Sequence, residues 1–107
     1  MDILLLYVPC GSEKEAKTIA KQLIADKLAA CANIPPGQSL YLWKGKHAEE
    51  IEFVLLLKTL PKKGEEARKK IEALHSYGVP CIASWKIKVN AAYGKWVSDR
   101  HSESDLN

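Results

Sequence analysis

Cysteine and histidine side chains are the groups in this 107-residue chain whose types could do chemistry. Thiolates and imidazoles bind copper and zinc ions, and a thiolate is also a nucleophile. No two of them have a spacing typical of metal sites, such as Cys-x-x-Cys or two histidines four residues apart. Spacing alone therefore supports no metal site within one chain, and it leaves open a site that subunits share. The six side chains are Cys10, Cys31, Cys81, His47, His75 and His101.

Each cysteine has a structural and a functional interpretation. Cys31 lies among alanines, either as a small buried hydrophobic residue or as a soft-metal ligand. Cys81 follows Pro80 at the expected start of a strand, as a structural residue or a ligand for Cu(I). Cys10 lies in a turn before a helix, where it is a small turn residue or a thiol whose pKa the helix dipole lowers. The odd number of cysteines, with no close pair, predicts no disulfide framework and favours a cytoplasmic location.

Several classes of function are disfavoured. A cysteine nucleophile needs a nearby base, and no local Cys/His signature is present, so we do not expect an enzyme. The scattered glycines form no phosphate-binding loop. The net charge of +3 is mild, and the aromatic strand motif of RNA-binding domains is absent, so we expect no nucleic-acid partner. No apolar run approaches the length of a membrane span, and the first residues do not read as a signal peptide, so we expect no membrane partner.

The longest strand pattern, residues 49–59, is the element around which the rest is arranged. Its apolar residues alternate on one face, and the second face changes from polar to apolar along the strand. A strand of this kind is typical of the centre of a sheet. The alternating residues are Ile51, Phe53, Leu55 and Leu57.

The remaining elements complete an alternation of strands and helices. Residues 3–8 form a buried strand, and a capping box of Ser12 and Glu15 begins a helix that ends near residues 29–30. Residues 39–43 pair with the central strand in a hairpin with Gly45 in its turn. A helix at 65–75 ends with His75 as a C-terminal cap, a strand spans 81–89, and Asn90 caps a short last helix.

This order predicts an α+β fold of the ferredoxin-like kind, β-α-β-β-α-β with a short C-terminal helix. Right-handed crossovers place the first and third strands in the middle of the sheet. We expect one domain over residues 1–107, with a frayed polar tail at 102–107.

Three separated motifs carry a resemblance to a known family. They are LAACANI at residues 28–34, the hairpin SLYLWKGK with EFVLLLKT between residues 39 and 59, and HSYGVPCI at residues 75–82. In this order and spacing they resemble the CutA family, the divalent-cation tolerance proteins, over nearly the whole chain. The resemblance implies a ferredoxin-like protomer, a homotrimer and a role linked to copper and other divalent metals. It implies no established catalytic reaction.

The resemblance also implies which residues form sites. Its metal-ligand candidates are Cys31, a position where the family keeps cysteine, His75 and Cys81. Its pocket candidates are Lys58, Tyr77 and Trp43. Lys58 either binds an anion or lies solvated at the end of its strand. The aromatic Tyr77 and Trp43 either line the pocket or are core or interface residues. Apolar hairpin residues are expected at the trimer interface, since an uncovered strand edge is a pairing site. These residues are Leu40, Leu42, Trp43 and Ile51.

The third motif departs from the family pattern in two places. The family has His-Pro-Tyr and Pro-Glu-Ile, whereas this chain has His75-Ser76-Tyr77 and Pro80-Cys81-Ile82. A thiol therefore replaces an anionic carboxylate, which favours a soft metal over any chemistry that needs the carboxylate.

Two hypotheses of different classes follow. The first is a CutA-like homotrimer associated with divalent-metal tolerance, with weak to moderate binding of copper or zinc. The alternative is a signalling or scaffold trimer like the PII proteins, which bind small anionic ligands between subunits and have no intrinsic metal function.

Overall fold

The computed structural model describes residues 1–102, which form five strands, three α-helices and one short 3₁₀ turn. None of these helices is long and apolar enough to cross a membrane. In chain order the elements are β1 (Asp2–Cys10), α1 (Glu13–Ala25), β2 (Cys31–Asn33), β3 (Pro36–Trp43), β4 (Lys46–Thr59), η1 (Pro61–Lys63), α2 (Gly64–Leu74), β5 (Ala83–Lys88) and α3 (Ala91–Ser102).

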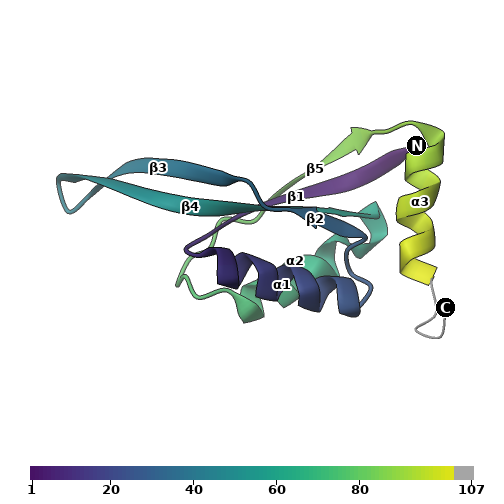
Figure 1. The fold of residues 1–107 in the computed structure, drawn as a ribbon, viewed down its shortest axis with the longest axis horizontal. Helices are drawn as coiled ribbons and strands as arrows, with labels where there is room; N and C mark the ends of the chain where they lie inside the picture. The colour runs from purple at the N-terminus through teal and green to yellow at the C-terminus, as the bar shows by residue number, and fades with distance from the viewer. Residues whose placement is uncertain (103–107) are drawn as a thin grey trace.

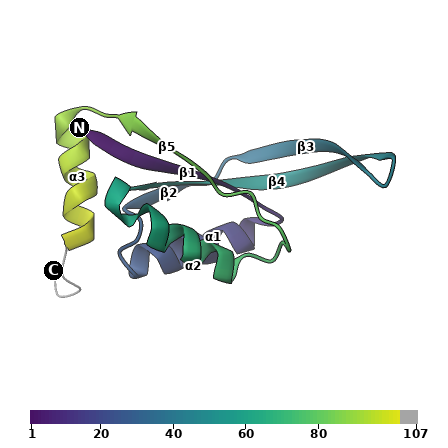
Figure 2. The ribbon, with the colours of Figure 1, turned by 180° about the vertical axis from the view of Figure 1, so that it is seen from behind.

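All five strands belong to one antiparallel sheet. Its order is β2-β4-β1-β5, and β3 pairs with the remaining length of β4. The predicted central position of the first strand and of the long strand is confirmed, because β1 and β4 pair with each other. Helices α1 and α2 lie side by side on one face of the sheet, and α3 stands at the end opposite the hairpin (Figures 1 and 2). This is the predicted ferredoxin-like arrangement.

The hydrophobic core lies between the sheet and the α1–α2 layer. Alternate residues of β1 and β4 point into it, where they meet the apolar stripe of each helix. The opposite face of the sheet is only half covered within the chain: Tyr7, Val54 and Leu56 are partly exposed and Trp85 is exposed. The core residues include Leu6, Val8, Ile19, Leu23, Leu55, Leu57 and Ile71.

The β3–β4 hairpin extends well beyond the helical layer (Figure 1). Lys44 and Gly45 have φ angles of 52° and 77°, and positive angles at both central residues are typical of the tight turn that suits a twisted hairpin. The predicted turn at Gly45 is therefore confirmed. The radius of gyration is 14.9 Å, larger than the roughly 13 Å expected for a compact chain of this length. The excess agrees with a hairpin that stands out from the body.

Helix α1 ends at Ala25, earlier than the predicted residues 29–30. Lys27 has a left-handed φ of 58°, and the Leu28 and Lys27 N–H groups donate to the carbonyls of Leu23 and Ile24. These two bonds form a Schellman motif, which usually has glycine at its left-handed position. Because lysine stands there instead of glycine, the sequence does not indicate the helix end.

Two further boundaries differ from the predictions. Residues 31–33, which belong to none of the predicted elements, form β2 against residues 56–58 of β4, because this edge of β4 has free backbone groups there. Strand β3 starts at Pro36 rather than at 39, and proline is tolerated as the first residue of a strand. The last strand begins at Ala83, so Cys81 precedes it instead of starting it.

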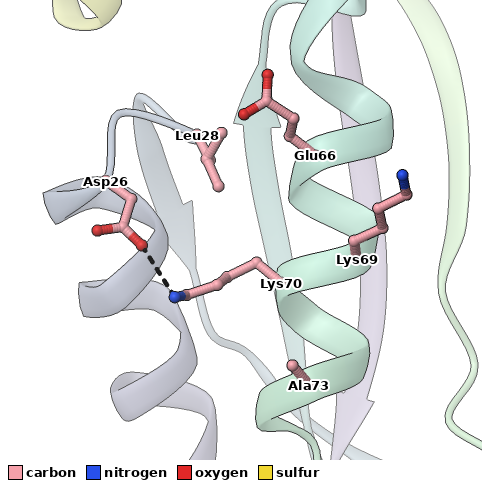
Figure 3. Close-up of a pocket in the computed structure, with 6 residues that line it drawn as sticks. All are labelled: Asp26, Leu28, Glu66, Lys69, Lys70 and Ala73. Atoms are coloured by element: carbon pink, nitrogen blue, oxygen red, sulfur yellow. Dashed lines mark ion pairs between the residues drawn. The ribbon is translucent and has the colours of Figure 1, made fainter.

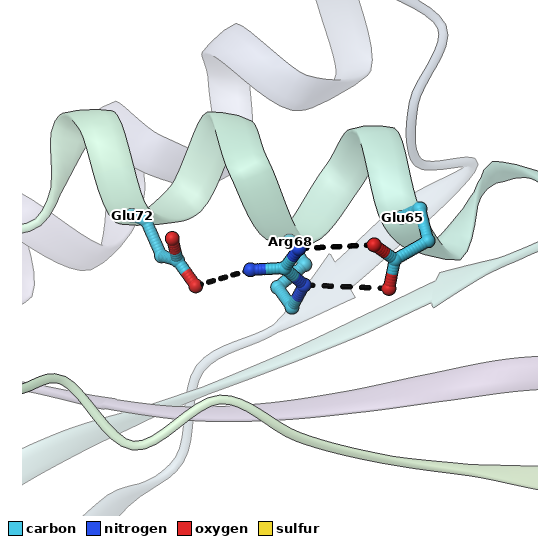
Figure 4. Close-up of polar contacts among 3 residues, drawn as sticks. All are labelled: Glu65, Arg68 and Glu72. Atoms are coloured by element: carbon cyan, nitrogen blue, oxygen red, sulfur yellow. Dashed lines mark hydrogen bonds and ion pairs between the residues drawn. The ribbon is translucent and has the colours of Figure 1, made fainter.

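Helix α2 is held to the body by few side chains. Only Ala67 and Ile71 are buried, while Arg68 on the outer side donates to the carboxylates of Glu65 and Glu72 (Figure 4). Ion pairs three and four residues apart support an exposed helical face.

The last helix is longer than expected. It runs for 12 residues to Ser102, so the predicted tail begins too early. The Gly94 N–H donates to the Asn90 carbonyl, which places Asn90 at the predicted cap position. Residues 103–107 of the predicted tail lie outside the described residues.

Truncation of a core residue in α1 tests this packing. Leu23 is fully buried, and Ile24 beside it is exposed. We expect Leu23→Ala to lower the free energy of unfolding by about 2–5 kcal/mol, because it removes buried apolar surface and leaves a cavity. Urea denaturation of Ile24→Ala is the matched control, and an equal loss in both variants would contradict the assigned core face.

Candidate functional site

Three side chains that can ligate a metal ion meet at one end of the α1–α2 layer. Cys10 is the last residue of β1, Glu15 lies in the first turn of α1, and His75 directly follows α2. One ligand atom of each (the thiol sulfur, a carboxylate oxygen and a ring nitrogen) lies within 4.8 Å of the others. Within residues 1–102 this is the one group of its kind. Sulfur, oxygen and nitrogen together suit zinc or copper.

The Cys10 thiol is buried and protonated. Burial, and after it the negative charges of Glu15 and Glu52, together raise its pKa to about 12. Its sulfur lies 3.5 Å from the Val8 carbonyl oxygen, to which the thiol donates. The interpretation of Cys10 as a thiol activated by the helix dipole is therefore wrong, because loss of solvent outweighs the dipole. A metal ion would have to displace this proton.

The Glu15 carboxylate connects two turns that are far apart in the sequence. It accepts the Gly11 N–H at 3.3 Å and the Ser76 N–H at 3.0 Å. Burial alone would raise the pKa of Glu15, but the hydrogen bonds from Ser76 and Gly11 and the nearby His75 lower it below its usual value. The result is an ionised carboxylate beside the imidazole and the thiol.

The predicted capping box is confirmed in one half. The Ser12 hydroxyl accepts the Glu15 N–H at 3.1 Å. The Glu15 side chain bonds Gly11 and Ser76 where the motif predicts a return bond to Ser12.

The His75 imidazole is nearly buried, and both of its nitrogens have backbone partners. Nδ1 accepts the Tyr77 N–H at 3.1 Å, and Nε2 lies 2.9 Å from the Pro9 carbonyl oxygen. These partners assign the proton to Nε2, which donates to Pro9. The backbone amide of His75 donates to the Ile71 carbonyl, so its predicted position at the C-terminal cap of α2 is confirmed.

A groove of about 820 Å³ lies along the hairpin next to this group. Its aromatic rings come from β3 and from the segment after α2, and β4 supplies two carboxylates. The Tyr77 hydroxyl donates to Glu52 at 2.9 Å, and the Tyr77 ring packs against His75 with their centroids 4.6 Å apart. Its lining residues are Ser39, Tyr41, Trp43, Ala48, Glu50, Glu52, Tyr77, Gly78 and Val79.

A second pocket, of about 460 Å³, opens between α1 and α2. Lys70 reaches across it to Asp26, with 3.4 Å between the ammonium nitrogen and a carboxylate oxygen (Figure 3). Its lining is charged and open, and it contains none of the site residues predicted from the sequence.

Comparison with known proteins decides the family. Residues 4–100 match the family described as CutA1 divalent ion tolerance protein. The chain belongs to this family. It is 40% identical over 100 residues to the divalent-cation tolerance protein CutA of Thermus thermophilus, a match that covers 92% of this chain and 95% of the relative. The CutA protein of Archaeoglobus fulgidus is 42% identical over 83 residues, which cover 78% of this chain and 81% of the relative.

Solved structures agree with this assignment. The CutA1 structure from Ehrlichia chaffeensis has a TM-score of 0.90 and 33% identity, covering 92% of this chain and 94% of that chain. The structure named periplasmic divalent cation tolerance protein CutA from Archaeoglobus fulgidus has a TM-score of 0.87 and 36% identity, covering 92% and 98%. The CutA resemblance and the ferredoxin-like fold predicted from the sequence are thus confirmed.

The predicted metal ligands of this CutA chain are not all brought together. His75 belongs to the group with Cys10 and Glu15, whereas Cys31 and Cys81 belong to no group of three within residues 1–102. Cys81 is exposed in the segment before β5.

Cys31 lies at the far end of the sheet from this group, in a different polar environment. It pairs across β2 and β4 with Lys58, and its sulfur lies 3.5 Å from the Tyr93 hydroxyl oxygen. The Lys58 ammonium lies 5.4 Å from the Tyr93 ring centroid. The hydrogen bond to Cys31 and burial raise the pKa of Tyr93, against the opposite effect of Lys58.

The predicted pocket residues lie near opposite ends of β4. Trp43 and Tyr77 line the same groove, whereas Lys58 does not. Lys58 is six residues along β4 from Glu52, or roughly 20 Å in an extended strand. Within one chain these three side chains therefore do not form a single pocket.

The other two histidines lie outside the Cys10–Glu15–His75 group. The imidazole of His101 contacts the Thr59 hydroxyl at 2.8 Å and the Val97 carbonyl at 2.9 Å, so it fastens α3 to the end of β4. His47 is exposed near the hairpin tip, opposite Leu42.

The role of Glu15 can be tested through the pH dependence of stability. Because its pKa is lower in the folded than in the unfolded chain, Glu15 stabilises the fold above the unfolded pKa of about 4.3. This contribution is lost as the pH falls through the folded value. We expect Glu15→Gln to destabilise the protein at pH 7 and to approach wild type at low pH, in urea denaturation from pH 7 to pH 3.

Glu13→Gln is the matched control for that experiment. Glu13 lies in the same helical turn and pairs with Lys17 on the exposed side. An equal pH dependence of the two variants would contradict the assigned role of Glu15.

Proposed function

We propose that this CutA chain binds copper or zinc through Cys10, Glu15 and His75. The observation that carries the proposal is the approach of three different ligand atoms to within 4.8 Å. Two of the three residues are separated by about 60 positions in the sequence, so the fold itself creates the group. Membership of a divalent-cation tolerance family supports a metal as the ligand.

The present hydrogen bonds set the expected strength of binding. A metal ion must replace the Cys10 proton, and His75 must give up a bond to Pro9 or to Tyr77. Ligand deprotonation and rearrangement reduce the apparent affinity. We therefore expect weak to moderate binding, which suits a tolerance role better than a permanent structural metal.

Cys31 and Cys81 remain proposed ligands of a separate kind. Each is a free thiol, and Cys81 is exposed. In a trimer, thiols of neighbouring subunits can approach one another, so these two would act at a site shared between chains. We propose no catalytic reaction, and the free cysteines favour a cytoplasmic location.

The proposal includes a homotrimer formed through the hairpin and the open face of the sheet. Four large apolar hairpin side chains are more than 60% exposed: Leu40, Leu42, Trp43 and Ile51. Exposed apolar surface of this extent, beside a sheet face that the chain itself only half covers, favours association. The PII-like alternative requires a pocket that binds an anion through Lys58. The groove along the hairpin does not contain Lys58 and so does not favour this alternative.

Removal of one thiol tests the metal site. We expect native mass spectrometry of the reduced protein with copper or zinc to show one bound ion per subunit. Cys10→Ala should weaken binding about tenfold or more, because it removes a ligand. Glu13→Gln, on the exposed side of the first turn of α1, is the control and should retain the ion. Retention of the ion by Cys10→Ala would contradict the proposed site.

Introduction of negative charge on the hairpin tests the trimer. We expect the wild-type protein to sediment as a trimer and the double variant Leu40→Glu, Leu42→Glu to sediment as a monomer, because carboxylates would be buried unpaired in the interface. Lys21→Glu on the exposed side of α1 is the control and should remain trimeric. A monomeric wild-type protein would rule out this interface.

A further inference from the structure

The imidazole of His75 has a single lone pair to give, and Tyr77 already uses it. Nδ1 accepts the Tyr77 N–H at 3.1 Å, and Nε2 lies 2.9 Å from the Pro9 carbonyl oxygen. Because a carbonyl oxygen only accepts, Nε2 carries the ring proton and Nδ1 carries the free lone pair. A metal ion needs the same lone pair. His75 can therefore bind the Tyr77 N–H or a metal ion, but not both at once.

The bond to Pro9 decides which nitrogen is the ligand. Histidines that bind metals commonly donate their second ring N–H to a carboxylate or a backbone carbonyl. The Nε2–H group already makes such a bond to Pro9. Ligation through Nε2 would break this bond and put the proton on Nδ1, where it would face the Tyr77 N–H. Nδ1 is thus the favoured ligand, and Tyr77 loses its acceptor with either nitrogen.

Tyr77 is held by three further contacts. Its hydroxyl donates to Glu52 at 2.9 Å, and its ring packs against His75 with the centroids 4.6 Å apart. A Cβ atom added at Gly11 would lie only 3.3 Å from the Tyr77 hydroxyl oxygen, so the side chain also lies close to the turn after β1. Burial and the bond to Glu52 raise the pKa of Tyr77, which keeps its hydroxyl protonated and donating.

The chain on the two sides of Tyr77 differs in its attachments. Before it, the Ser76 N–H donates to Glu15 at 3.0 Å, and a carboxylate has enough lone pairs to keep this bond while it binds an ion. After it, nothing within residues 1–102 lies within 4 Å of a Cβ atom added at Gly78, and Val79 is 93% exposed in the single chain. Displacement of the Tyr77 amide is therefore taken up by Tyr77 and the residues that follow.

We propose that metal binding to His75 displaces Tyr77 from Glu52, so that Tyr77 couples the metal site to the hairpin. This inference rests on the metal site proposed above. Glu52 belongs to the part of β4 that pairs with β3, so the metal-bound and metal-free states differ at the hairpin. All of these contacts lie within one chain, which makes the coupling compatible with a hairpin packed between subunits. The coupling is reciprocal: Tyr77 bound to Glu52 weakens metal binding.

Removal of the Tyr77 hydroxyl tests this coupling through metal affinity. Tyr77→Phe keeps the ring and the backbone N–H but has no bond to Glu52 to lose. We expect it to bind zinc about threefold or more tightly than wild type, in isothermal titration of the reduced, assembled protein at pH 7. Tyr41→Phe removes a hydroxyl that donates to Glu50 instead, and it should bind zinc like wild type. Unchanged or weaker binding by Tyr77→Phe, or equal tightening in both variants, would overturn the proposal.

Nitrogen-15 NMR of the unaltered protein tests the same proposal without a variant that has to fold. We expect zinc to shift the Nδ1 resonance of His75, to leave its Nε2 protonated and to shift the backbone amide resonance of Tyr77. The ring resonances of His47 and His101 serve as references. Zinc on Nε2, or an unchanged Tyr77 amide with zinc bound at His75, would overturn the proposal.

Cys10→Ala in the same titration separates failure of the coupling from failure of the metal site. If wild type binds no zinc, or if Cys10→Ala binds it equally well, the proposed metal site is wrong and the coupling falls with it. If Cys10→Ala loses zinc while Tyr77→Phe binds it like wild type, the metal site stands and only the coupling is wrong.

Discussion

The antiparallel pairing of β1 with β4 is the constraint on which the rest of the structure depends. Seven residue pairs, from Leu4 opposite Thr59 to Cys10 opposite Phe53, fix the register of the two central strands. A shift of one residue would turn every buried side chain of a strand to the opposite face. The same register sets where β1 ends, and hence where Cys10 meets the helical layer.

At that end, a single polar network serves structure and candidate chemistry together. Glu15 and His75 bind the backbone of the turns after β1 and α2, and this fixes their side chains beside the buried Cys10 thiol. The thiol, the carboxylate and the imidazole could hold a metal ion, and each already has a hydrogen-bond partner. A metal ion bound there would compete with these partners.

The part of β4 that pairs with β3 lies in the hairpin and has different surroundings. Beyond Phe53 the strand leaves the helical layer and continues into the hairpin, where apolar side chains lie exposed on both faces. One face carries Leu40, Leu42 and Ile51, and the other carries Tyr41 and Trp43 with two carboxylates. The alternation of a strand thus gives one hairpin two surfaces of different chemistry.

The sequence by itself determined the order of elements, the central strands, the hairpin turn and the family, because hydrophobic alternation, Gly45 and three motifs are local signals. It did not reveal the helix end at Lys27, because a lysine in the left-handed conformation has no sequence signature. It also did not reveal β2, because the pairing of this strand depends on a free edge of β4. The sequence indicated Cys10 and His75 as candidate functional side chains, and it indicated Glu15 only as part of a capping box. Their meeting, and the separation of Lys58 from Tyr77, were decided by the tertiary structure, because strand register and helix packing join positions that no local pattern connects.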